Sequence, residues 1–316
     1  MNVKISILIQ MDPFERLNQN TDTTFCLIIE ALKRNYKVMC CEPKDIYFEN
    51  KKINAYASNL SLTNKNQIIK EKKQEDLNLS SFDVVLLRKD PPFDMNYITN
   101  TYLNTYQFQK RKKPFFINNP NSLRSYSEKI YPLYFHSFIP KTIISCNPKK
   151  IYSFISKQKK VVIKPLYLKG GEDIYMIEKN DQNSDNILKY ITNNFTTPIV
   201  VQRFLEGVKN GDKRVILIDG EPAGSINRIP VKGDFRANLH LGGSGEKTEL
   251  TQKEKEICKG IKDSLRKNGL FFVGIDIIDE KLTEINVTSP TGIVQINKIN
   301  NTKIEKIFWD RALKKV

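Results

Sequence analysis

The first 120 residues alternate between short apolar runs and longer stretches whose apolar residues recur at helical spacing. The short runs predict buried strands, and the longer stretches predict helices. In chain order the expected elements are a strand at 4–10, a helix at 24–36, strands at 37–42 and 82–90, a helix at 96–113 and a strand at 114–120. This alternation predicts an open α/β domain. In such a domain ligands bind beyond the carboxyl ends of the strands, where Asp12, Arg88 and Asp90 follow apolar runs.

The pattern changes after Pro120 and predicts a second part of mixed α+β type. The expected elements are a helix at 121–135, two strands within 159–178, a helix at 181–195, a strand at 197–207, a hairpin at 212–230, a helix at 251–269 and a hairpin at 271–287. The first hairpin has a strong turn signal in Asp219-Gly220. Residues 231–246 are rich in glycine and have no period, which is uncommon unless a segment is functional or mobile.

The hairpin at 271–287 carries the clearest candidate chemistry. With a turn at 279–281, Asp276 lies opposite Glu284, and strand alternation puts Asn286 on the same face as Glu284. Two carboxylates in a cross-strand pair repel each other unless a cation lies between them. Oxygen ligands without histidine or cysteine favour Mg²⁺ or Mn²⁺ over softer metals. We therefore expect a metal site here, and the alternative is a polar edge that faces solvent.

Lys164 marks a second candidate, because it ends the apolar run Val161–Ile163. Lysine is rarely buried without a partner, so an anionic group is expected beside it. The surrounding stretch VVIKPLYLKGGEDI (161–174) is either a hairpin turned by its glycines or a loop that holds phosphates. Other single lysines are weak signals in a chain this rich in lysine.

The formal net charge of +16 raises the possibility of nucleic-acid binding. The lysines are spread along the whole chain, and the local run KRKK (110–113) is most simply a solvated face. No zinc-finger, basic-zipper or RNA-recognition pattern accompanies them. We therefore expect no nucleic-acid partner, although a basic surface favours small anionic ligands.

The five cysteines are odd in number and form no CxxC pair, which favours reduced thiols and a cytoplasmic location. With two histidines in the chain, a histidine-based metal site or catalytic triad is not expected. No apolar run approaches the ~20 residues that cross a bilayer, so no membrane partner is expected.

Eight short stretches occur in an order and at a spacing that resemble prokaryotic glutathione synthetases, members of the ATP-grasp superfamily. They are MDP (11–13), LLRKDPPFD (86–94), NNPNSLRSYSEK (118–129), KPL (164–166), NGDKRV (210–215), NRIP (227–230), GGSGE (242–246) and FVGIDII with LTEINVTSPTGI (272–293). The resemblance runs essentially end to end. It implies a fold with an N-terminal open α/β (pre-ATP-grasp) domain at 1–122 and a two-lobed ATP-grasp domain at 123–316, divided into a small lid subdomain (123–200) and a catalytic subdomain (201–316).

The same resemblance implies a role for each matching residue. The metal ligands would be Asp276, Glu284 and Asn286, in agreement with the strand pattern above. Arg214 and Arg228 would be catalytic, stabilising the phosphates and an oxyanion. The ATP-binding residues would be Lys129, Lys164, Gly170, Gly171, Gln202, Arg203, Phe204, Leu205 and Asp212. The substrate-binding residues would be Arg88, Asp90, Arg236, Ser289 and Thr291.

The implied reaction is the ATP-dependent ligation of γ-glutamylcysteine to glycine through an acyl phosphate, with ADP and phosphate released. Mg²⁺ or Mn²⁺ would be the cofactor, small molecules the partners, and a homotetramer the assembly. The segment 229–246 would be a lid, with Arg236 closing over the substrate.

The chain departs from the family pattern at two places. Leu168 stands where the phosphate loop commonly has a further glycine, and Val294-Gln295 stand where a basic–acidic pair is usual. Together with Tyr167, Leu168 is expected to stiffen the loop and impair its closure. The alternatives are another ATP-grasp carboxylate–amine ligase, such as a D-alanyl-D-alanine ligase-like enzyme, or a catalytically impaired nucleotide-binding homologue.

Overall fold

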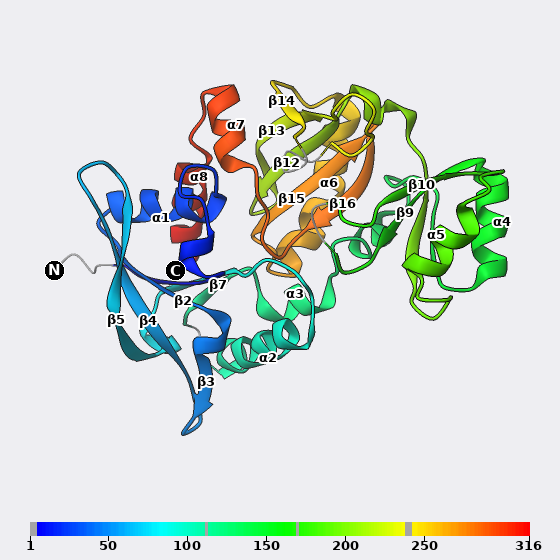
Figure 1. The fold of residues 1–316 in the computed structure, drawn as a ribbon. Helices are drawn as coiled ribbons and strands as arrows, with labels where there is room; N and C mark the ends of the chain where they lie inside the picture. The colour runs from blue at the N-terminus through cyan, green and yellow to red at the C-terminus, as the bar shows by residue number, and fades with distance from the viewer. Residues whose placement is uncertain (1–4, 111–112, 169–170, 238–241) are drawn as a thin grey trace.

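The computed structural model describes residues 5–110, 113–168, 171–237 and 242–316. Its strands form three sheets that follow one another along the chain, as the colours from blue to red show in Figure 1. In Figure 1 the N-terminal sheet lies on the left, the third sheet in the middle and the small sheet on the right. Within the described residues, no helix combines the length and the apolar character needed to cross a membrane.

The N-terminal sheet has the strand order β3-β4-β2-β1-β6-β7, and β5 pairs with β4. Its central strands β2, β1, β6 and β7 are parallel, which confirms the expected open α/β arrangement. Its strands are β1 (Ser6–Met11), β2 (Lys37–Cys41), β3 (Ile46–Glu49), β4 (Lys52–Leu62), β5 (Ile68–Asn78), β6 (Val84–Arg88) and β7 (Phe115–Ile117). Its helices are α1 (Thr23–Lys33) and α2 (Met95–Lys110).

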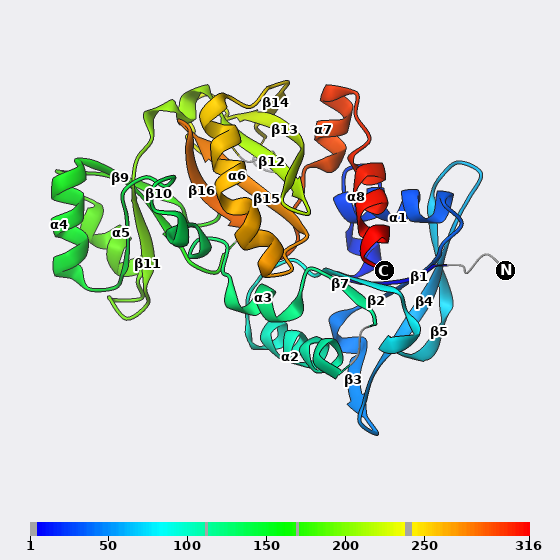
Figure 2. The same cartoon turned by 180° about the vertical axis from the view of Figure 1, so that it is seen from behind.

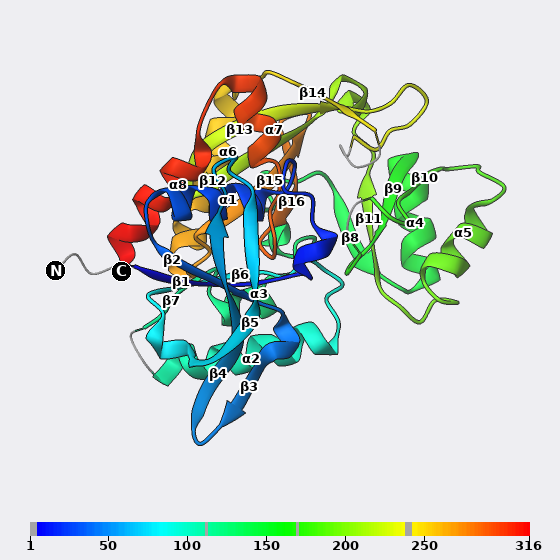
Figure 3. The same cartoon turned by 60° about the vertical axis from the view of Figure 1, so that its left-hand side comes forward.

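The antiparallel strands β3, β4 and β5 extend this sheet in a way the apolar pattern does not predict. Figure 3 shows the long β4–β5 pair running past the parallel strands. Most of β5 is exposed, so the strand lacks the apolar face by which strands are recognised.

The small sheet is antiparallel, with the order β10-β9-β11-β8. Helices α4 and α5 cover it on the side away from β16 (Figures 1 and 2), and their apolar residues form a separate small core with β9 and β11. Its elements are β8 (Thr142–Ser145), α4 (Pro148–Gln158), β9 (Lys160–Pro165), β10 (Tyr175–Glu178), α5 (Ser184–Ile191) and β11 (Ile199–Arg203).

The third sheet is antiparallel, with the order β14-β13-β12-β15-β16. The expected first hairpin is confirmed, since Asp219 and Gly220 both have positive φ angles, 51° and 75°. Its elements are β12 (Asp212–Ile218), β13 (Glu221–Ile229), β14 (Ser244–Glu246), α6 (Gln252–Lys267), β15 (Phe272–Ile278), β16 (Lys281–Asn286), α7 (Ile293–Asn300) and α8 (Ile304–Ala312).

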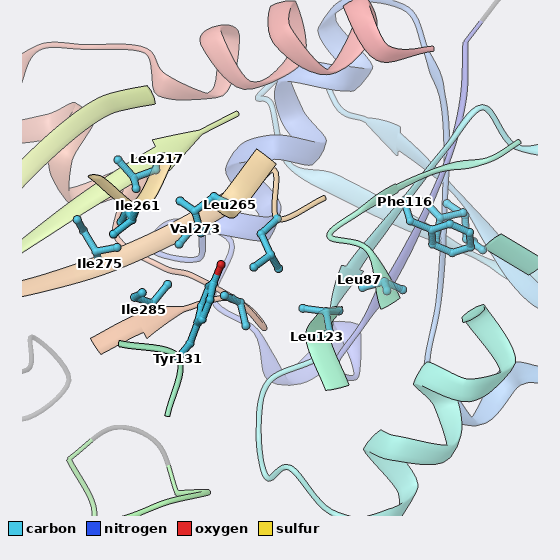
Figure 4. Packing of buried hydrophobic residues seen from close by; sticks show 14 of the residues in the cluster. Leu87, Phe116, Leu123, Tyr131, Leu217, Ile261, Leu265, Val273, Ile275 and Ile285 are labelled. Atoms are coloured by element: carbon cyan, nitrogen blue, oxygen red, sulfur yellow. The ribbon is translucent and has the colours of Figure 1, made fainter. Parts of the chain in front are cut away.

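Helix α6 packs across one face of the third sheet, as Figure 2 shows. Its apolar face, which includes Ile261 and Leu265, joins Leu217, Val273 and Ile275 of the sheet in one core (Figure 4). A capping box begins the helix: Thr251 accepts from the N–H of Glu254, and the Glu254 carboxylate accepts from the N–H of Thr251. Because α6 covers one face of β15 and β16, the other face of these strands is turned toward the small sheet.

The helix expected over 121–135 is wrong as a continuous element. A short helix α3 (Pro120–Ser125) and a 3₁₀ turn η4 (Tyr131–Phe135) flank a non-helical connection. Within that connection the carbonyl of Glu128 accepts the backbone N–H of Ile285 at 3.1 Å. Pairing with β16 thus replaces helix in this stretch and fixes Glu128 and Lys129 beside the third sheet.

The C-terminal helix α8 connects the two large parts of the molecule. Trp309 is fully buried and donates its indole N–H to the carbonyl of Leu27 in α1 at 2.9 Å. Its neighbour Phe308 packs edge-on against Phe272 at the start of β15. These contacts hold the N-terminal domain against the third sheet.

We propose domain limits of 1–122 and 123–316, with one adjustment inside the second domain. Strand β11 runs from Ile199 to Arg203 and belongs to the small sheet. A subdomain boundary at 200 would divide this strand, so we place the boundary after Arg203.

Asn118 joins the last strand of the N-terminal domain to the third sheet. Its buried amide donates to the carbonyls of Phe272 and Val287 at 2.7 and 2.8 Å and accepts the N–H of Phe272 at 2.7 Å. We expect Asn118→Ala to lower the free energy of unfolding by about 2–4 kcal/mol, because it leaves buried backbone groups unpaired. Urea denaturation measures this, with exposed Asn121→Ala as the control. A loss below about 1 kcal/mol would contradict the role given to this side chain.

Candidate active site

A hollow lies between the small sheet and the third sheet, and it has about 1000 Å³ of empty space counting its open mouth. This is in the size range of clefts that bind small molecules. Thirteen of the expected site residues line it, contributed by both sheets: Lys129, Lys164, Gly171, Gln202, Arg203, Phe204, Leu205, Asp212, Arg214, Arg236, Asp276, Glu284 and Asn286. Gly170 lies outside the described residues.

The β15–β16 hairpin has the expected register but a different turn. The turn consists of two residues, Asp279 and Glu280, both with positive φ angles, so the expected three-residue turn is wrong. A bulge at Thr283 then restores the pairing of Asp276 with Glu284. The buried Ile285 alternates with half-buried Glu284 and Asn286, which line the hollow.

Asp276 is the centre of a buried charge cluster. It lies directly opposite Arg214 on β12, and its carboxylate accepts two hydrogen bonds from that guanidinium at 2.5 and 2.9 Å. Arg228 of β13 approaches the same carboxylate at 3.0 Å. Burial alone would raise the pKa of Asp276, but the two guanidinium groups outweigh burial and hold this pKa well below its usual range.

Asp212 shares Arg228 with Asp276. Asp212 and Arg228 are cross-strand partners, and the Arg228 guanidinium donates to Asp212 Oδ2 at 2.6 Å. Burial and the charge of Asp276 raise the pKa of Asp212 to about 6, although Arg228 acts in the opposite direction. Asp212 Oδ1 is buried and has no hydrogen-bond partner among the described residues. A hydroxyl donor from a ligand would satisfy this oxygen.

Two lysines face the hollow from opposite directions. Lys164 of β9 has the anionic partner that its burial requires, since its ammonium lies 3.8 Å from the Glu284 carboxylate across the hollow. Lys129 donates to the carbonyl of Leu168 at 2.7 Å. Because an ammonium group has three donors, this bond leaves Lys129 able to contact a phosphate as well.

Glu128 is a lining residue that the sequence does not reveal. Its carboxylate accepts a hydrogen bond from Thr288 at 2.6 Å. Burial and the nearby Glu284 charge raise the pKa of Glu128 despite that bond. Its backbone carbonyl pairs with β16, which is a long-range contact that no local pattern in the sequence indicates.

The segment 202–205 forms the rim of the hollow at the end of β11. The backbone N–H groups of Arg203 and Phe204 already donate to the carbonyls of Lys141 and Lys160. The ring of Phe204 contacts Phe235 edge-on and carries the Lys160 ammonium 4.3 Å from its centroid. Because these two N–H groups are already paired, a ligand that binds the backbone of this segment would contact mainly Leu205.

Five expected site residues lie outside the hollow: Arg88, Asp90, Arg228, Ser289 and Thr291. Arg228 is buried behind the lining, against Asp212 and Asp276. Thr291 contributes its carbonyl, which accepts from Arg214 at 3.2 Å. The backbone N–H of Asp90 donates to Asp12, which also pairs with Lys89.

Arg88 is a buried cation at the carboxyl end of β6, 3% exposed. Its Nε donates to Thr24 at 3.1 Å, while Nη1 and Nη2 have no hydrogen-bond partner among the described residues. A buried guanidinium with free donors is costly unless an anion completes it. Ser289, three residues beyond β16, donates to the Arg88 carbonyl at 3.4 Å, so this anion site lies close to the end of the β16 strand.

Asp276, Glu284 and Asn286 could together hold a hard divalent cation. Asn286 donates its amide N–H to Asp276 at 3.3 Å, which leaves its amide oxygen as the acceptor for a ligand. Within the described ranges no group of three or more His, Cys, Asp and Glu side chains is placed to hold a metal. The set of two carboxylates and one amide fits a cation that takes its remaining ligands from substrate and water.

Comparison with known proteins identifies the family. The family model for the N-terminal domain of prokaryotic glutathione synthetase matches residues 5–124, and the model for its ATP-grasp domain matches residues 128–301. The chain belongs to the prokaryotic glutathione synthetase family. The glutathione synthetase of Mesorhizobium japonicum is 40% identical over 311 residues, which cover 98% of each chain. That of Coxiella burnetii is 42% identical over 298 residues, covering 94% of this chain and 92% of the relative.

Solved structures place this family member in the ATP-grasp fold. A D-cycloserine synthetase superposes with a TM-score of 0.66 at 12% identity and covers 97% of this chain and 99% of its own. The D-alanyl-alanine synthetase A of Vibrio cholerae superposes with a TM-score of 0.58 at 13% identity, with 98% of each chain covered. At such identities these structures show a shared fold alone.

The charge cluster around Asp276 predicts a pH-dependent cost for losing Arg228. In Arg228→Met, Asp212 and Asp276 would no longer share a cation, and we expect about 3–5 kcal/mol less stability at pH 8. Arg228 lowers the pKa of Asp212, which is about 6 in the unmodified protein, so in Arg228→Met this pKa should be higher still. The folded variant then takes up its proton at a higher pH than the unmodified protein does, and the deficit should shrink by pH 5.

Urea denaturation at the two pH values measures this difference, and Arg228→Lys, which keeps the charge, serves as the control. An equal deficit for Arg228→Met at pH 5 and pH 8 would show that Arg228 does not balance these carboxylates.

Proposed function

We propose that this protein joins γ-glutamylcysteine to glycine, consuming ATP and releasing ADP and phosphate. The observation that carries the proposal is the family match, which spans both domains and extends to relatives named glutathione synthetase at about 40% identity over nearly the full length. The geometry adds two anion sites near the end of β16. One is the hollow, which Lys129 and Lys164 line, and the other is the buried Arg88.

ATP would occupy the hollow between the two ATP-grasp lobes. Leu205 at the rim would read the base edge, and the unpaired Oδ1 of Asp212 would accept from the ribose hydroxyls. Lys129 and Lys164 would neutralise phosphate charge. Gly171 and Gly170 would allow the backbone to approach the phosphates closely.

Asp276, Glu284 and Asn286 would bind Mg²⁺ or Mn²⁺, which offsets the phosphate charge of the bound nucleotide. The protein's part is to keep Asp276 ionised and to fix the positions of the three ligands. Arg214 and Arg228 hold Asp276 in its charged form, and the hairpin register holds Glu284 opposite it.

The peptide would bind at the end of β6, with a carboxylate on the free donors of Arg88. Asp90, Ser289 and Thr291 would contribute further substrate contacts, and Ser289 already donates to the Arg88 carbonyl. Arg236 lines the hollow from the other side, where it pairs with Asp234 and donates to the Gly171 carbonyl at 3.4 Å. Residues 238–241 of the expected lid segment 229–246 lie outside the described residues. We propose that Arg236, in the described part of the segment, contacts substrate.

The reaction then needs positioning and charge neutralisation more than covalent participation by the protein. The cysteinyl carboxylate attacks the γ-phosphorus and ADP leaves, which gives an acyl phosphate. The glycine amine attacks the acyl carbon, and phosphate leaves with the C–O bond electrons as the amine loses its proton. Arg214, which lines the hollow, would stabilise the negative oxygens, and Arg228 would act from behind the lining by holding Asp212 and Asp276. Exclusion of water would protect the acyl phosphate from hydrolysis.

The cellular location, the oligomeric state and the partners are inferred from the sequence. The five cysteines are free in the structure, as a reducing compartment would leave them, and we propose a cytoplasmic location. We propose a homotetramer from the family resemblance. The partners would be the three small-molecule substrates, without nucleic acid.

The activity is tested by ADP release with γ-glutamylcysteine and glycine, each omitted in turn. We expect turnover with both present, and at most a slow hydrolytic release when glycine is absent, because the acyl phosphate then has no amine acceptor. Turnover that is independent of glycine would exclude this function and favour another carboxylate–amine ligase.

Glu284→Gln tests the proposed metal site in the same assay. It should fold but lose turnover at least a hundredfold, since a charged ligand of the cation is removed. Glu178→Gln, at an exposed position on β10, is the matched control. Unchanged turnover in Glu284→Gln would overturn the metal assignment without affecting the identity of the substrates.

A further inference from the structure

The loop after β9 carries an exposed tyrosine that has a partner in a different domain. Tyr167 is 49% exposed, and its ring stacks on Phe93 with a centroid separation of 6.1 Å and an interplanar angle of 16°. Phe93 in turn lies 5.0 Å from Tyr97, which is 7% exposed at the start of α2. Tyr167 therefore rests on an aromatic group that is anchored in the N-terminal domain.

The same loop borders the nucleotide hollow. The carbonyl of Leu168 accepts from Lys129, and the carbonyl of Gly171 accepts from Arg236. Leu168 and Gly171 both line the hollow. Because Leu168 directly follows Tyr167, the position of Tyr167 sets the position of the Leu168 carbonyl and of the Lys129 ammonium that it holds.

The other partner belongs to the peptide side. Phe93 lies five residues after Arg88, in the stretch that leaves the carboxyl end of β6. Pro91 and Phe93 share a small apolar hollow with Tyr167 and Leu168, and Glu128 is among its other lining residues. Glu128 also lines the nucleotide hollow, so the two sites meet at this point.

We propose that the Phe93–Tyr167 stack is a latch that couples nucleotide binding to peptide binding, with both aromatic residues acting as positioning residues. The inference rests on the proposed function for the identity of the peptide. A ligand on Arg88 that orders the β6 exit favours the loop position in which the rings meet. The same position of Tyr167 presents the adjacent Leu168, whose carbonyl holds Lys129, to the nucleotide. Because coupling between binding sites is reciprocal, each ligand should then tighten the other.

The test is calorimetric titration of ADP with Mg²⁺, with and without saturating γ-glutamylcysteine. We expect the peptide to tighten ADP binding by about fivefold in the unmodified protein, the size that one aromatic stack supports. Tyr167→Ala should reduce this factor to about one, and Tyr167→Phe, which keeps the ring, should retain it. Phe93→Leu should lose it as well, and the double variant Phe93→Leu/Tyr167→Ala should lose no more than either single variant.

Tyr190→Ala, at a 65% exposed position on α5, is the control and should keep the full coupling. The proposal is overturned if the peptide does not tighten ADP binding in the unmodified protein, or if Tyr167→Ala keeps the coupling. Failure of the ligase reaction with retained, Tyr167-dependent coupling would instead overturn the proposed function and leave the latch standing. A merely structural role would weaken ADP binding equally with and without peptide.

Discussion

The ion pair between Arg214 and Asp276 is the interaction on which the site depends. The two residues are direct cross-strand partners on β12 and β15, so the sheet register alone brings them together. A buried carboxylate is stable only if it is paired, and here two guanidinium groups compensate it. That compensation keeps Asp276 charged, and a charged Asp276 next to Glu284 is what makes a cation site chemically reasonable.

The junction between the domains is held by polar groups as well as by the core. Asn118 connects the end of the N-terminal sheet to Phe272 of β15 and to Val287 just beyond β16. The backbone of Glu128 pairs with Ile285, which lies between the candidate metal ligands Glu284 and Asn286. The connection between the domains is thus part of the active-site wall. This explains why a stretch with helical sequence character is broken there: Glu128 and Lys129 are needed in a conformation that a helix would not allow.

How much the sequence predicts depends on the range of the interaction. Local signals identified the parallel strands, the Asp219-Gly220 turn and the register of the last hairpin, although two errors in that hairpin cancelled: a turn one residue too long and an unforeseen bulge at Thr283. Strand β5 was missed because its exposed polar residues give no apolar period. Helices α7 and α8 are short, and their burial comes from long-range contacts with β13 of the third sheet and with α1, which local periodicity cannot show.

The candidate site shows the same division. The metal-ligand set follows from alternation within one hairpin, whereas the pairing of Lys164 with Glu284 crosses between two sheets and could be expected only as an unspecified anionic partner. The role of Glu128 and the stacking of Tyr167 on Phe93 depend on how the N-terminal domain and the two subdomains of the ATP-grasp domain meet. Tyr167 and Leu168 were expected to impair loop closure; the structure gives Tyr167 a partner, and whether closure is impaired stays a prediction.

The most direct test of the central claim, ligation through an acyl phosphate, follows one oxygen atom. γ-Glutamylcysteine labelled with ¹⁸O in its cysteinyl carboxylate would be turned over with ATP and glycine, and the released phosphate analysed by mass spectrometry. The account predicts one ¹⁸O atom in each phosphate, because the carboxylate oxygen that attacks the γ-phosphorus leaves with the phosphate. Phosphate without label, formed together with the ligated product, would contradict it.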